Sequence, residues 1–496
     1  MRKQGLCFLL GIFGLVAQAQ QVLDLQSCKE LAIRNNKQIK ISSENIKKAE
    51  AQKKEAFTQY LPDVSLTAAY FYNQKNISLL DADKYLPIGT VMPDGSFGFT
   101  PEQISNQWTM VNGSPVPLDA NGQIFNPSQN PEKILWKEHA IIPKSQFELD
   151  IHNMFAGTIS VVQPIFMGGK IIAYNKINDY AVQLAESMNE AGVQDIIVQV
   201  EQVYWQNVSL SNKLKLSNKL VVLLNQMNRD MEYMIEEGVA TKADGLSVKV
   251  RLNEAEMTQT QAFNGLQLSK MLLCQLCGLP LDESVILKDE NSEEIQTENT
   301  LVVVDVNKAF EDRPELKSLN LASRIYEKKE DIVRAEMMPT IALMGNYMVS
   351  NPNSFNGFQH KFDGMWNVGV MLNMPIFHWG EKKHKLQAAK AETRIKRLEI
   401  EEAKEKIELQ INRDVFKLSE SEKKLIAAEK NKENAEENLR YASLGFKEGV
   451  IPAINLMEAQ TAWYKAYSNL IDAQIDIQLN RIQLAKSMGS LTTNDY

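Results

Sequence analysis

The chain of 496 residues carries a formal net charge of -8 and four cysteines. An acidic balance without basic runs argues against nucleic acid as a partner. After residue 19, no stretch of the sequence offers the roughly 18 uninterrupted apolar residues that a membrane-spanning helix requires. If the protein enters a membrane, it must therefore do so as β-strands.

The first segment, residues 1–19, is typical of a secretory signal. Arg2 and Lys3 precede an apolar run, and the small-residue site Ala17-Gln18-Ala19 follows it. Cleavage there removes two positive charges, so the net charge changes from -8 to -10 (-8 minus 2). We expect the mature chain to begin near Gln20 and to reside in the cell envelope.

The cysteines and histidines form no recognisable site. Cys28 lies too far from the cleavage point to carry a lipid anchor. The pair Cys274-Gln275-Leu276-Cys277 invites a redox or zinc interpretation, but it has no second cysteine pair or histidine cluster beside it, and we interpret it as buried apolar cysteines. The five histidines have no ligand spacing, and the sequence contains no nucleophile elbow or phosphate loop. We therefore predict no catalytic residue, no cofactor and no metal, which excludes an enzyme.

An internal repeat organises the mature chain. The segment Gln163–Gly169 returns as Met374–Gly380 at a shift of 211, and the same shift places Gly238 on Gly449. The register therefore holds from the end of a strand pattern to the end of a long helix pattern.

The two copies differ by one insertion. Upstream of the strands the shift is 277, which aligns Asn36 with Arg313, so the two shifts differ by 66. The first copy holds the extra residues in a Pro-, Gly- and Asn-rich segment, where the second has only a short turn. The predicted organisation is a signal peptide (1–19), a first repeat (20–282, with the insertion at 73–154), a linker (283–304) and a second repeat (305–496).

Each copy reads as helix, strand, strand, very long helix and helix. The first helices are predicted at about 27–59 and 307–336, each stopped by the following proline. The proline-free patterns from Gly169 to Gly238 and from Gly380 to Gly449 should each form a helix roughly 100 Å long, followed by a returning helix. Two narrow coiled-coil stripes are predicted along the long helices: Ile177, Ala181, Leu184, Met188 and Ala191 in the first, and Ile400, Ile407, Ile411, Leu418 and Leu425 in the second. We interpret Met227, Met231 and Met234 as core residues, not as soft-metal ligands.

The four predicted strands alternate with period two. Apolar residues occupy every second position, for example from Val64 to Tyr72 and from Val368 to Leu372, so one face suits lipid and the other water. Aromatic residues bracket the return strands and predict an aromatic belt: Phe155 with Phe166, and Trp366 with Phe377. A soluble β-sandwich is the alternative.

The number of strands predicts oligomerisation. Four strands cannot close a membrane barrel, since about eight is the practical minimum and open edges are not tolerated in lipid. Long helices attached to every strand would extend such a barrel into a helical tube across a periplasm. This geometry predicts a duct.

The doubled plan resembles the outer-membrane efflux protein family, of which TolC is the best-known member. The resemblance lies in the strand ends Pro164-Ile165-Phe166 and Pro375-Ile376-Phe377 and in the turns Glu237-Gly238-Val239 and Lys447–Pro452, and it covers nearly the whole mature chain. It implies a mainly α fold with membrane β: a homotrimer in which each protomer gives four strands to one transmembrane β-barrel and long antiparallel helices to a periplasmic α-barrel. The implied location is the outer membrane, in contact with its lipid and extending into the periplasm.

The resemblance also implies a function. The trimer would dock on a periplasmic adaptor (membrane fusion) protein and an inner-membrane pump, and would act as the passive exit duct of a tripartite efflux or type I secretion system. A periplasmic coiled-coil adaptor or a structural envelope protein is the alternative. An adaptor would lack the two alternating strand pairs with aromatic brackets, and a structural coiled coil would lack strands altogether.

A periplasmic gate is implied on the helix after the second turn, where the family has two acidic residues three positions apart. Counting from Gly449, these places are Asn455 and Glu458, and a trimer would turn Glu458 into a ring of three carboxylates that favours cations. Asp244 matches an acidic residue after the first turn, but Phe446 stands where the family has its hydroxyl partner. Ordinary solvent-facing residues are the alternative.

Two surfaces are expected to meet partners or the exterior. The turns present Val239 and Val450, beside Gly238 and Gly449, for contact with an adaptor; helix C-cap glycines with staple residues are the alternative. The insertion at 73–154 should lie outside the cell, because the strands on either side of it pair as a hairpin whose other ends join periplasmic helices. The alternative for the insertion is a disordered spacer.

Overall fold

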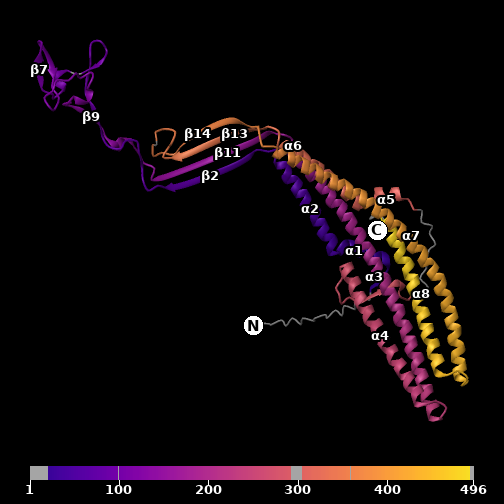
Figure 1. Ribbon diagram of the computed structural model, residues 1–496. Helices are drawn as coiled ribbons and strands as arrows, with labels where there is room; N and C mark the ends of the chain where they lie inside the picture. Colours follow the sequence, from indigo (N-terminus) through magenta and orange to yellow (C-terminus); the bar gives the residue numbers. More distant parts are fainter. Residues whose placement is uncertain (1–20, 99, 292–303, 358, 492–496) are drawn as a thin grey trace, which may run out of the picture. The chain divides into compact units, whose positions relative to one another are not determined.

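In the computed structural model the chain forms two units. The helical unit comprises Met1–Gln59, Gly168–Met338 and Pro375–Tyr496, and the strand unit comprises Tyr60–Met167 and Pro339–Met374. The structure describes residues 21–98, 100–291, 304–357 and 359–491 (Figure 1). The predicted signal peptide and most of the predicted linker lie outside these residues.

The helical unit is built from helices of very different lengths. They are α1 (Leu25–Asn35), α2 (Lys37–Thr58), α3 (Lys170–Glu236), α4 (Lys242–Cys277), α5 (Val306–Asp312), α6 (Pro314–Ala335), α7 (Glu381–Lys447) and α8 (Ala453–Ser487). A short parallel strand pair, β1 (Gln21–Leu23) with β12 (Val285–Leu287), joins the start of the described chain to the segment after α4.

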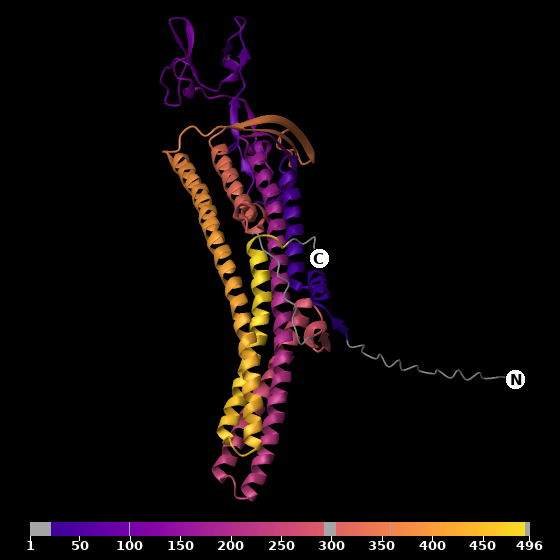
Figure 2. The same ribbon diagram turned by 90° about the vertical axis from the view of Figure 1, so that its right-hand side faces the viewer.

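The long helices α3 and α7 each have 67 residues, which confirms the proline-free patterns as single helices. Each is bounded by glycines with positive φ, at Gly169 (89°) and Gly238 (76°) and at Gly380 (82°) and Gly449 (72°). Glycine adopts this left-handed region without steric cost, so it can end a helix and reverse the chain. The predicted returning helices are confirmed: α4 runs back beside α3, and α8 beside α7 (Figures 1 and 2).

The first helix of each copy was predicted to be continuous, and this is wrong in both. The chain breaks at Asn36 (ψ 132°) between α1 and α2, and at Arg313 (ψ 121°) between α5 and α6. Arg313 precedes Pro314, whose ring disfavours the helical conformation of the residue before it. Asn36 instead caps α2, accepting a hydrogen bond from the Gln38 amide at 2.8 Å. The two breaks occupy positions that the shift of 277 aligns.

The predicted stripe on α7 is confirmed in its middle, where Ile407 and Ile411 are buried. The stripe on α3 is wrong, because Met188 is 60% exposed and α3 is instead buried on several sides around Val200 and Val208. A single stripe describes a helix with one neighbour, whereas α3 packs against α1, α2, α4, α6 and α8. The largest cluster of buried side chains lies here: Leu23, Cys28, Ala32, Ile196, Val200, Val203, Tyr204, Trp205, Val208, Leu273, Cys274, Cys277, Val285, Leu287 and Ile475.

The largest sheet of the strand unit is antiparallel and four-stranded, in the order β14-β13-β11-β2. Its strands are β2 (Asp63–Tyr72), β11 (Asn153–Met167), β13 (Thr340–Asn351) and β14 (Asp363–Asn373). The strands before and after the insertion, β2 and β11, pair directly, with Ile159 opposite Leu66. On its other side β11 pairs with β13, with Ile159 opposite Tyr347 and a bulge between Pro164 and Phe166.

The insertion is folded around a small core of its own. Ile104, Phe125 and Ile134 are buried together. Asn106 binds three backbone groups: its side-chain amide donates to the carbonyls of Leu118 (2.9 Å) and Lys133 (3.0 Å), and its oxygen accepts from the Leu135 amide (2.6 Å). Short strands pair within it: β3 (Ile77–Ser78) with β10 (Glu148–Leu149), β4 (Lys84–Pro87) with β9 (His139–Ile142), β5 (Thr90–Val91) with β6 (Phe97–Gly98), and β7 (Trp108–Val111) with β8 (Ser114–Pro117). These contacts contradict a disordered spacer.

Candidate functional site

The two faces of the sheet differ: one is apolar, and the other mixes polar and apolar side chains. In an antiparallel pair, residues opposite each other share a face, so the registers decide which side chains lie together. The apolar alternating sets of all four strands share one face: Val64, Leu66, Ala68, Tyr70 and Tyr72; Phe155, Ile159 and Val161; Leu343, Tyr347 and Val349; and Trp366, Val368, Val370 and Leu372. The opposite face is mixed: it carries hydroxyl and amide side chains together with Met344, Met348, Met365 and Met371, and Asn346 donates to Asn367 across β13 and β14 at 3.0 Å.

Both edges of this sheet are open. Within the described residues no strand pairs with the outer edge of β2 or of β14. The side chains of β14 are exposed along almost its whole length, including Val370 at 71%. An isolated edge of this length, with an apolar face, is unstable in water and in lipid unless another strand covers it.

Three of the four predicted belt residues belong to the sheet. Phe155 packs against Tyr70, with ring centroids 4.7 Å apart, and Phe166 lies near the other end of β11. Trp366 is in β14, opposite Tyr347. Phe377 departs from the prediction, because β14 ends at Asn373 and Phe377 belongs to the helical unit. Within the described residues, no strand pairs with the outer edge of β14.

The two turns of the helix hairpins have the same hydrogen bonds. After Gly238, the amides of Val239 and Ala240 donate to the Met234 carbonyl at 2.8 and 3.1 Å. After Gly449, the amides of Val450 and Ile451 donate to the Gly445 carbonyl at 2.8 and 3.1 Å. These bonds are helix C-caps, which agrees with the alternative interpretation of the two glycines.

The predicted contact residues of these turns are nevertheless free of the core. Val239 is 72% exposed and Val450 is 79% exposed. Capping therefore accounts for the glycines, whereas it requires no apolar side chain at either valine.

A cluster of buried side chains, here called the tip cluster, joins the two hairpins beneath the turns. It consists of Met227, Met231, Val248, Ala442, Phe446, Leu456, Met457 and Ala459. Met227 and Met231 are thus core residues, which confirms their interpretation. Phe446 is only 5% exposed and packs in the cluster, so it cannot serve as a polar partner at a gate.

The predicted gate residues differ in what they do. Asp244 accepts from the Thr241 amide (3.0 Å) and hydroxyl (2.6 Å), while the Asp244 amide donates to the Thr241 hydroxyl (3.2 Å). This reciprocal capping box begins α4, and the hydrogen bonds from Thr241 lower the pKa of the Asp244 carboxyl. Asn455 and Glu458 are both exposed on α8, three positions apart, with Leu456 and Met457 on the buried side.

The three cysteines of the described chain are buried and free, which confirms their interpretation as interior residues. The Cys277 thiol lies 3.5 Å from the Cys28 carbonyl, and hydrogen bonding with Cys277 together with burial raises the pKa of the Cys28 thiol. Among the residues that the structure describes, no group of three or more His, Cys, Asp or Glu is placed to hold a metal ion.

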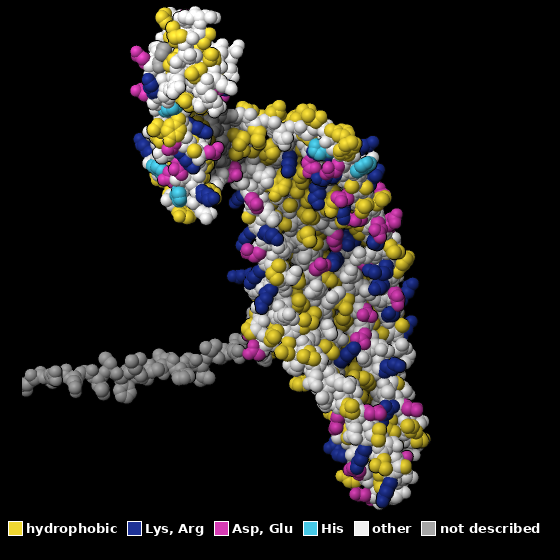
Figure 3. Space-filling view, turned by 60° about the vertical axis from the view of Figure 1, so that its left-hand side comes forward, with side chains coloured by type: hydrophobic (Ala, Val, Ile, Leu, Met, Phe, Trp, Pro, Cys, Tyr) yellow, Lys and Arg dark blue, Asp and Glu magenta, His cyan; other side chains and the backbone are white. Residues whose placement is uncertain are grey.

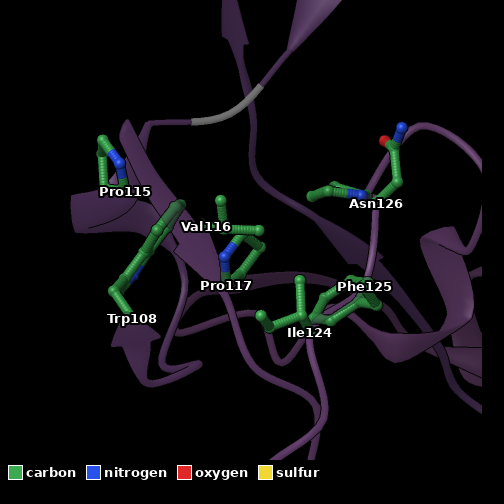
Figure 4. Close-up of a pocket in the computed structure, with 8 residues that line it drawn as sticks. Trp108, Pro115, Val116, Pro117, Ile124, Phe125 and Asn126 are labelled. Atoms are coloured by element: carbon green, nitrogen blue, oxygen red, sulfur yellow. The ribbon is translucent and has the colours of Figure 1, made fainter. Parts of the chain in front are cut away.

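A shallow cavity in the insertion was not predicted. It has a volume of about 440 Å³. Figure 4 shows Trp108 and Pro115 on one side and Ile124, Phe125 and Asn126 across from them. The signal in the sequence was the cluster of Trp and Pro in an otherwise polar segment. No charged side chain lines the cavity, so its geometry indicates no chemistry.

No helix within the described ranges is both long and apolar enough to cross a bilayer. Residues 306–490 match the model of the family described as outer membrane efflux protein. This part of the chain is similar to that family. The chain is 21% identical over 326 residues to the alkaline protease secretion protein AprF of Pseudomonas aeruginosa (66% of this chain, 67% of AprF), and 18% identical over 346 residues to the outer membrane protein TolC of Vibrio cholerae (69% of this chain, 78% of that protein).

The fold is likewise that of known channels. The outer membrane channel CmeC of Campylobacter jejuni superposes with a TM-score of 0.69 at 14% identity, over 95% of this chain and 88% of CmeC. These similarities support an outer membrane efflux or secretion channel that extends into the periplasm.

Proposed function

We propose that this outer membrane efflux protein is the passive exit duct of a tripartite efflux or type I secretion system. Three copies would close one twelve-stranded barrel in the outer membrane, and their helices would form the periplasmic part of the duct. A periplasmic adaptor protein would contact the helix-hairpin turns and connect the duct to an inner-membrane pump.

The observation that carries this proposal is a sheet with one apolar face and two open edges. An apolar face suits lipid, but four strands cannot close around a pore. Joining β14 of each copy to β2 of the next removes every edge. The opposite face, with the Asn346–Asn367 pair, then lines a water-filled interior.

The helical unit supports the same assembly. At 1.5 Å per residue, the 67 residues of α3 and of α7 extend roughly 100 Å. Large apolar side chains remain exposed on the helices, including Val222 (65%), Leu409 (71%) and Phe416 (73%). Figure 3 shows hydrophobic side chains running between charged ones along one face of the helices. Neighbouring copies would cover such residues.

The test is to measure mass and conductance on one preparation. Protein extracted from outer membranes in detergent should have the mass of a trimer and should give stable single-channel conductance in planar bilayers without nucleotide. A monomer that is released from membranes by salt or urea would instead favour the periplasmic adaptor and refute the duct.

The adaptor contact has a separate test at the turns. Replacing Val239 and Val450 by Asp should abolish export while the trimer remains in the membrane, because both side chains are exposed and neither supports the tip cluster. Replacing both by Ala removes apolar area without adding charge and should cause a smaller loss. Export that is unchanged by the Asp variants would exclude adaptor contact at these positions.

A further inference from the structure

We infer that β14 of one copy pairs antiparallel with β2 of the next copy in a single register, with Leu372 opposite Ala68, Val370 opposite Tyr70 and Val368 opposite Tyr72. The inference rests on the proposed homotrimer and deepens it, because it specifies the partner edge residue by residue. It also predicts that the segment after β14 becomes strand only on assembly.

The two strand hairpins within one chain, β2–β11 and β13–β14, pair in equivalent registers. In the first hairpin Val161 lies opposite Val64, and in the second Leu372 lies opposite Ile341. The shift of 211 carries Val161 to Leu372, and the shift of 277 carries Val64 to Ile341. The sequence repeat and the strand pairing therefore coincide without a slip.

The two hairpins of one chain contact each other through β11 and β13. Where β11 meets β13, Val161 lies opposite Gly345 and Ile159 lies opposite Tyr347. Under the same shifts these pairs become Leu372 with Ala68 and Val370 with Tyr70. A closed ring of hairpins that repeats this contact thus fixes the register between copies.

The faces of the sheet agree with this register. Leu372, Val370 and Val368 lie on the apolar face of β14, and Ala68, Tyr70 and Tyr72 lie on the apolar face of β2. If β14 and β2 of neighbouring copies slipped by one residue, the apolar face of one copy would join the opposite face of the next. Polar residues such as Thr67 and Thr158 would then face the lipid. Only slips of two residues preserve the faces, and those are the alternatives to exclude.

The last strand of the second copy, β14, is shorter than its counterpart β11. β11 continues to Met167, because β13 still pairs there, with Phe166 opposite Ile341 and Met167 opposite Thr340. The equivalent residues, Phe377 and His378, follow the end of β14 and have no strand beside them in one chain. The next copy would supply Val64 and Asp63 of its β2 at these places.

Assembly should therefore turn Met374–His378 into strand. A bulge is expected at Ile376, because the first copy has its bulge between Pro164 and Phe166. Ile376 is 92% exposed and Phe377 is 68% exposed in the single chain, as expected if β2 of the next copy covers them in the trimer.

The equivalence ends one residue later. A Cβ atom on Gly168 would lie 2.7 Å from the Ala335 carbonyl oxygen, so this position has no room for a side chain. Its counterpart is Trp379, which is 89% exposed with φ 48°. An indole cannot occupy the space of Gly168, so the contact between copies must be wider from Trp379 onward.

Cysteine crosslinking tests the register. One double variant, Tyr70→Cys with Val370→Cys, samples the apolar face, and a second, Ala69→Cys with Met371→Cys, samples the opposite face. Both are needed, because opposite residues are close enough for a disulfide mainly in the non-hydrogen-bonded rows, which all share one face. Matched controls shift one partner by two residues: Ala68→Cys or Tyr72→Cys with Val370→Cys, and Thr67→Cys or Phe71→Cys with Met371→Cys.

After mild oxidation in detergent, an in-register variant on at least one face should give covalent trimers on denaturing gels, several-fold more than its shifted controls. Equal or greater crosslinking of a shifted control overturns the register. Failure of every pair, in a preparation whose native mass is that of a trimer, overturns it too. A preparation that contains only monomers refutes the proposed homotrimer, and this inference with it.

Amide hydrogen exchange tests the change from coil to strand. The backbone amides of residues 376–378 should exchange slowly in the trimer and rapidly after dissociation. Fast exchange in an intact trimer would show that the segment stays unpaired.

Discussion

In both repeats, the residue at the break in the first helix donates a side-chain hydrogen bond to a backbone carbonyl at the end of the returning helix. In the first junction, the Asn36 side chain donates to the Leu276 carbonyl at 2.9 Å; in the second, Arg313 donates to the Ser487 carbonyl at 3.3 Å. The shifts of 277 and 211 carry one bond onto the other. A glycine with φ 69° follows in each, Gly278 or Gly489.

The side chains that contact the two junctions differ. The first lies against the largest apolar cluster, which includes Cys28 and Cys277. The second has a polar interior: Asp414 is 1% exposed and accepts from the Ser487 hydroxyl, which also accepts from the Gln410 amide at 3.1 Å. The position of Asp414 is held by Val203 in the first repeat. Both junctions therefore share a side-chain donor and a glycine with positive φ, whereas the side chains packed around them are apolar in one repeat and polar in the other.

The largest effect should come from replacing the junction glycines. A left-handed conformation costs an alanine about 1–2 kcal/mol, so both Gly278→Ala and Gly489→Ala should destabilise the protein. Gly278→Ala should cost more, because its Cβ would lie 2.5 Å from the Asn35 Cβ and 3.0 Å from the Asn35 backbone, whereas the nearest atom at Gly489 is 3.1 Å away. Urea unfolding of detergent-solubilised protein, followed by circular dichroism, measures the difference. Equal losses of unfolding free energy would mean that the backbone around Gly278 shifts to make room for a Cβ atom as readily as the backbone around Gly489.

The next effect separates the two donors. Arg313→Ala should cost on the order of 2 kcal/mol, because it removes charge-assisted bonds from a side chain that is 6% exposed. Asn36→Ala should cost about 1 kcal/mol for the lost cap of α2. The same unfolding measurement applies, with Arg324→Ala as an exposed-charge control. A smaller loss for Arg313→Ala than for Asn36→Ala would contradict a polar second junction that depends on its ion pair.

The second junction should also depend on pH. Burial acts to raise the pKa of the Glu315 carboxyl, but the hydrogen bonds and charge of Arg313 outweigh it and hold the pKa below the ordinary value. A carboxyl with a lowered pKa stabilises the fold above its unfolded pKa, and this stabilisation is lost as the pH falls through the folded pKa. Stability should therefore fall less steeply from pH 5 to pH 3 in Arg313→Ala than in the wild type, while Asn36→Ala keeps the wild-type slope. Parallel curves for all three proteins would exclude this ion pair as the cause.

Most features that local residues determine could be predicted from the sequence, although the break at Arg313 was missed despite the local signal of Pro314. Prolines and glycines delimit α3 and α7, and strict alternation identifies the strands, because turn glycines and period-two patterns act within a few residues. The break at Asn36 was missed, because its donor bond reaches Leu276, far away in the sequence. The stripe on α3 was wrong because its burial depends on several other helices. The bracket at Phe377 was wrong because β14 ends at Asn373, and the proposed pairing with another copy would account for this end.

For the candidate site, exposure and chain reversal at the turns could be predicted, but the role of Asp244 could not. A carboxylate three residues after a threonine fits both a capping box and a gate. Only the bonds to Thr241 distinguish them.

The smallest predicted effects concern the two tips, where the comparison of repeats separates capping from gating. Asp244 and Asn455 are equivalent under the shift of 211, and Thr241 is equivalent to Pro452. Pro452 has neither a hydroxyl nor an amide hydrogen, and α8 has no side-chain cap. A carboxylate at position 455 therefore has no capping bond to make, whereas the one at position 244 has two bonds to lose.

Asp244→Asn should weaken the start of α4, seen as faster amide exchange in residues 242–246, and should leave the cation selectivity of the channel unchanged. Asn455→Asp should do the opposite. It adds a carboxylate one helical turn before Glu458, so in a trimer the site would hold six negative charges in place of three, and block by trivalent cations from the periplasmic side should strengthen without a change in exchange. Glu458→Ala should weaken the same block and lower the selectivity. If Asp244→Asn alters selectivity as much as Glu458→Ala, then the first tip takes part in the gate despite its capping bonds; if neither Asn455→Asp nor Glu458→Ala changes the block, the constriction lies elsewhere on the helices.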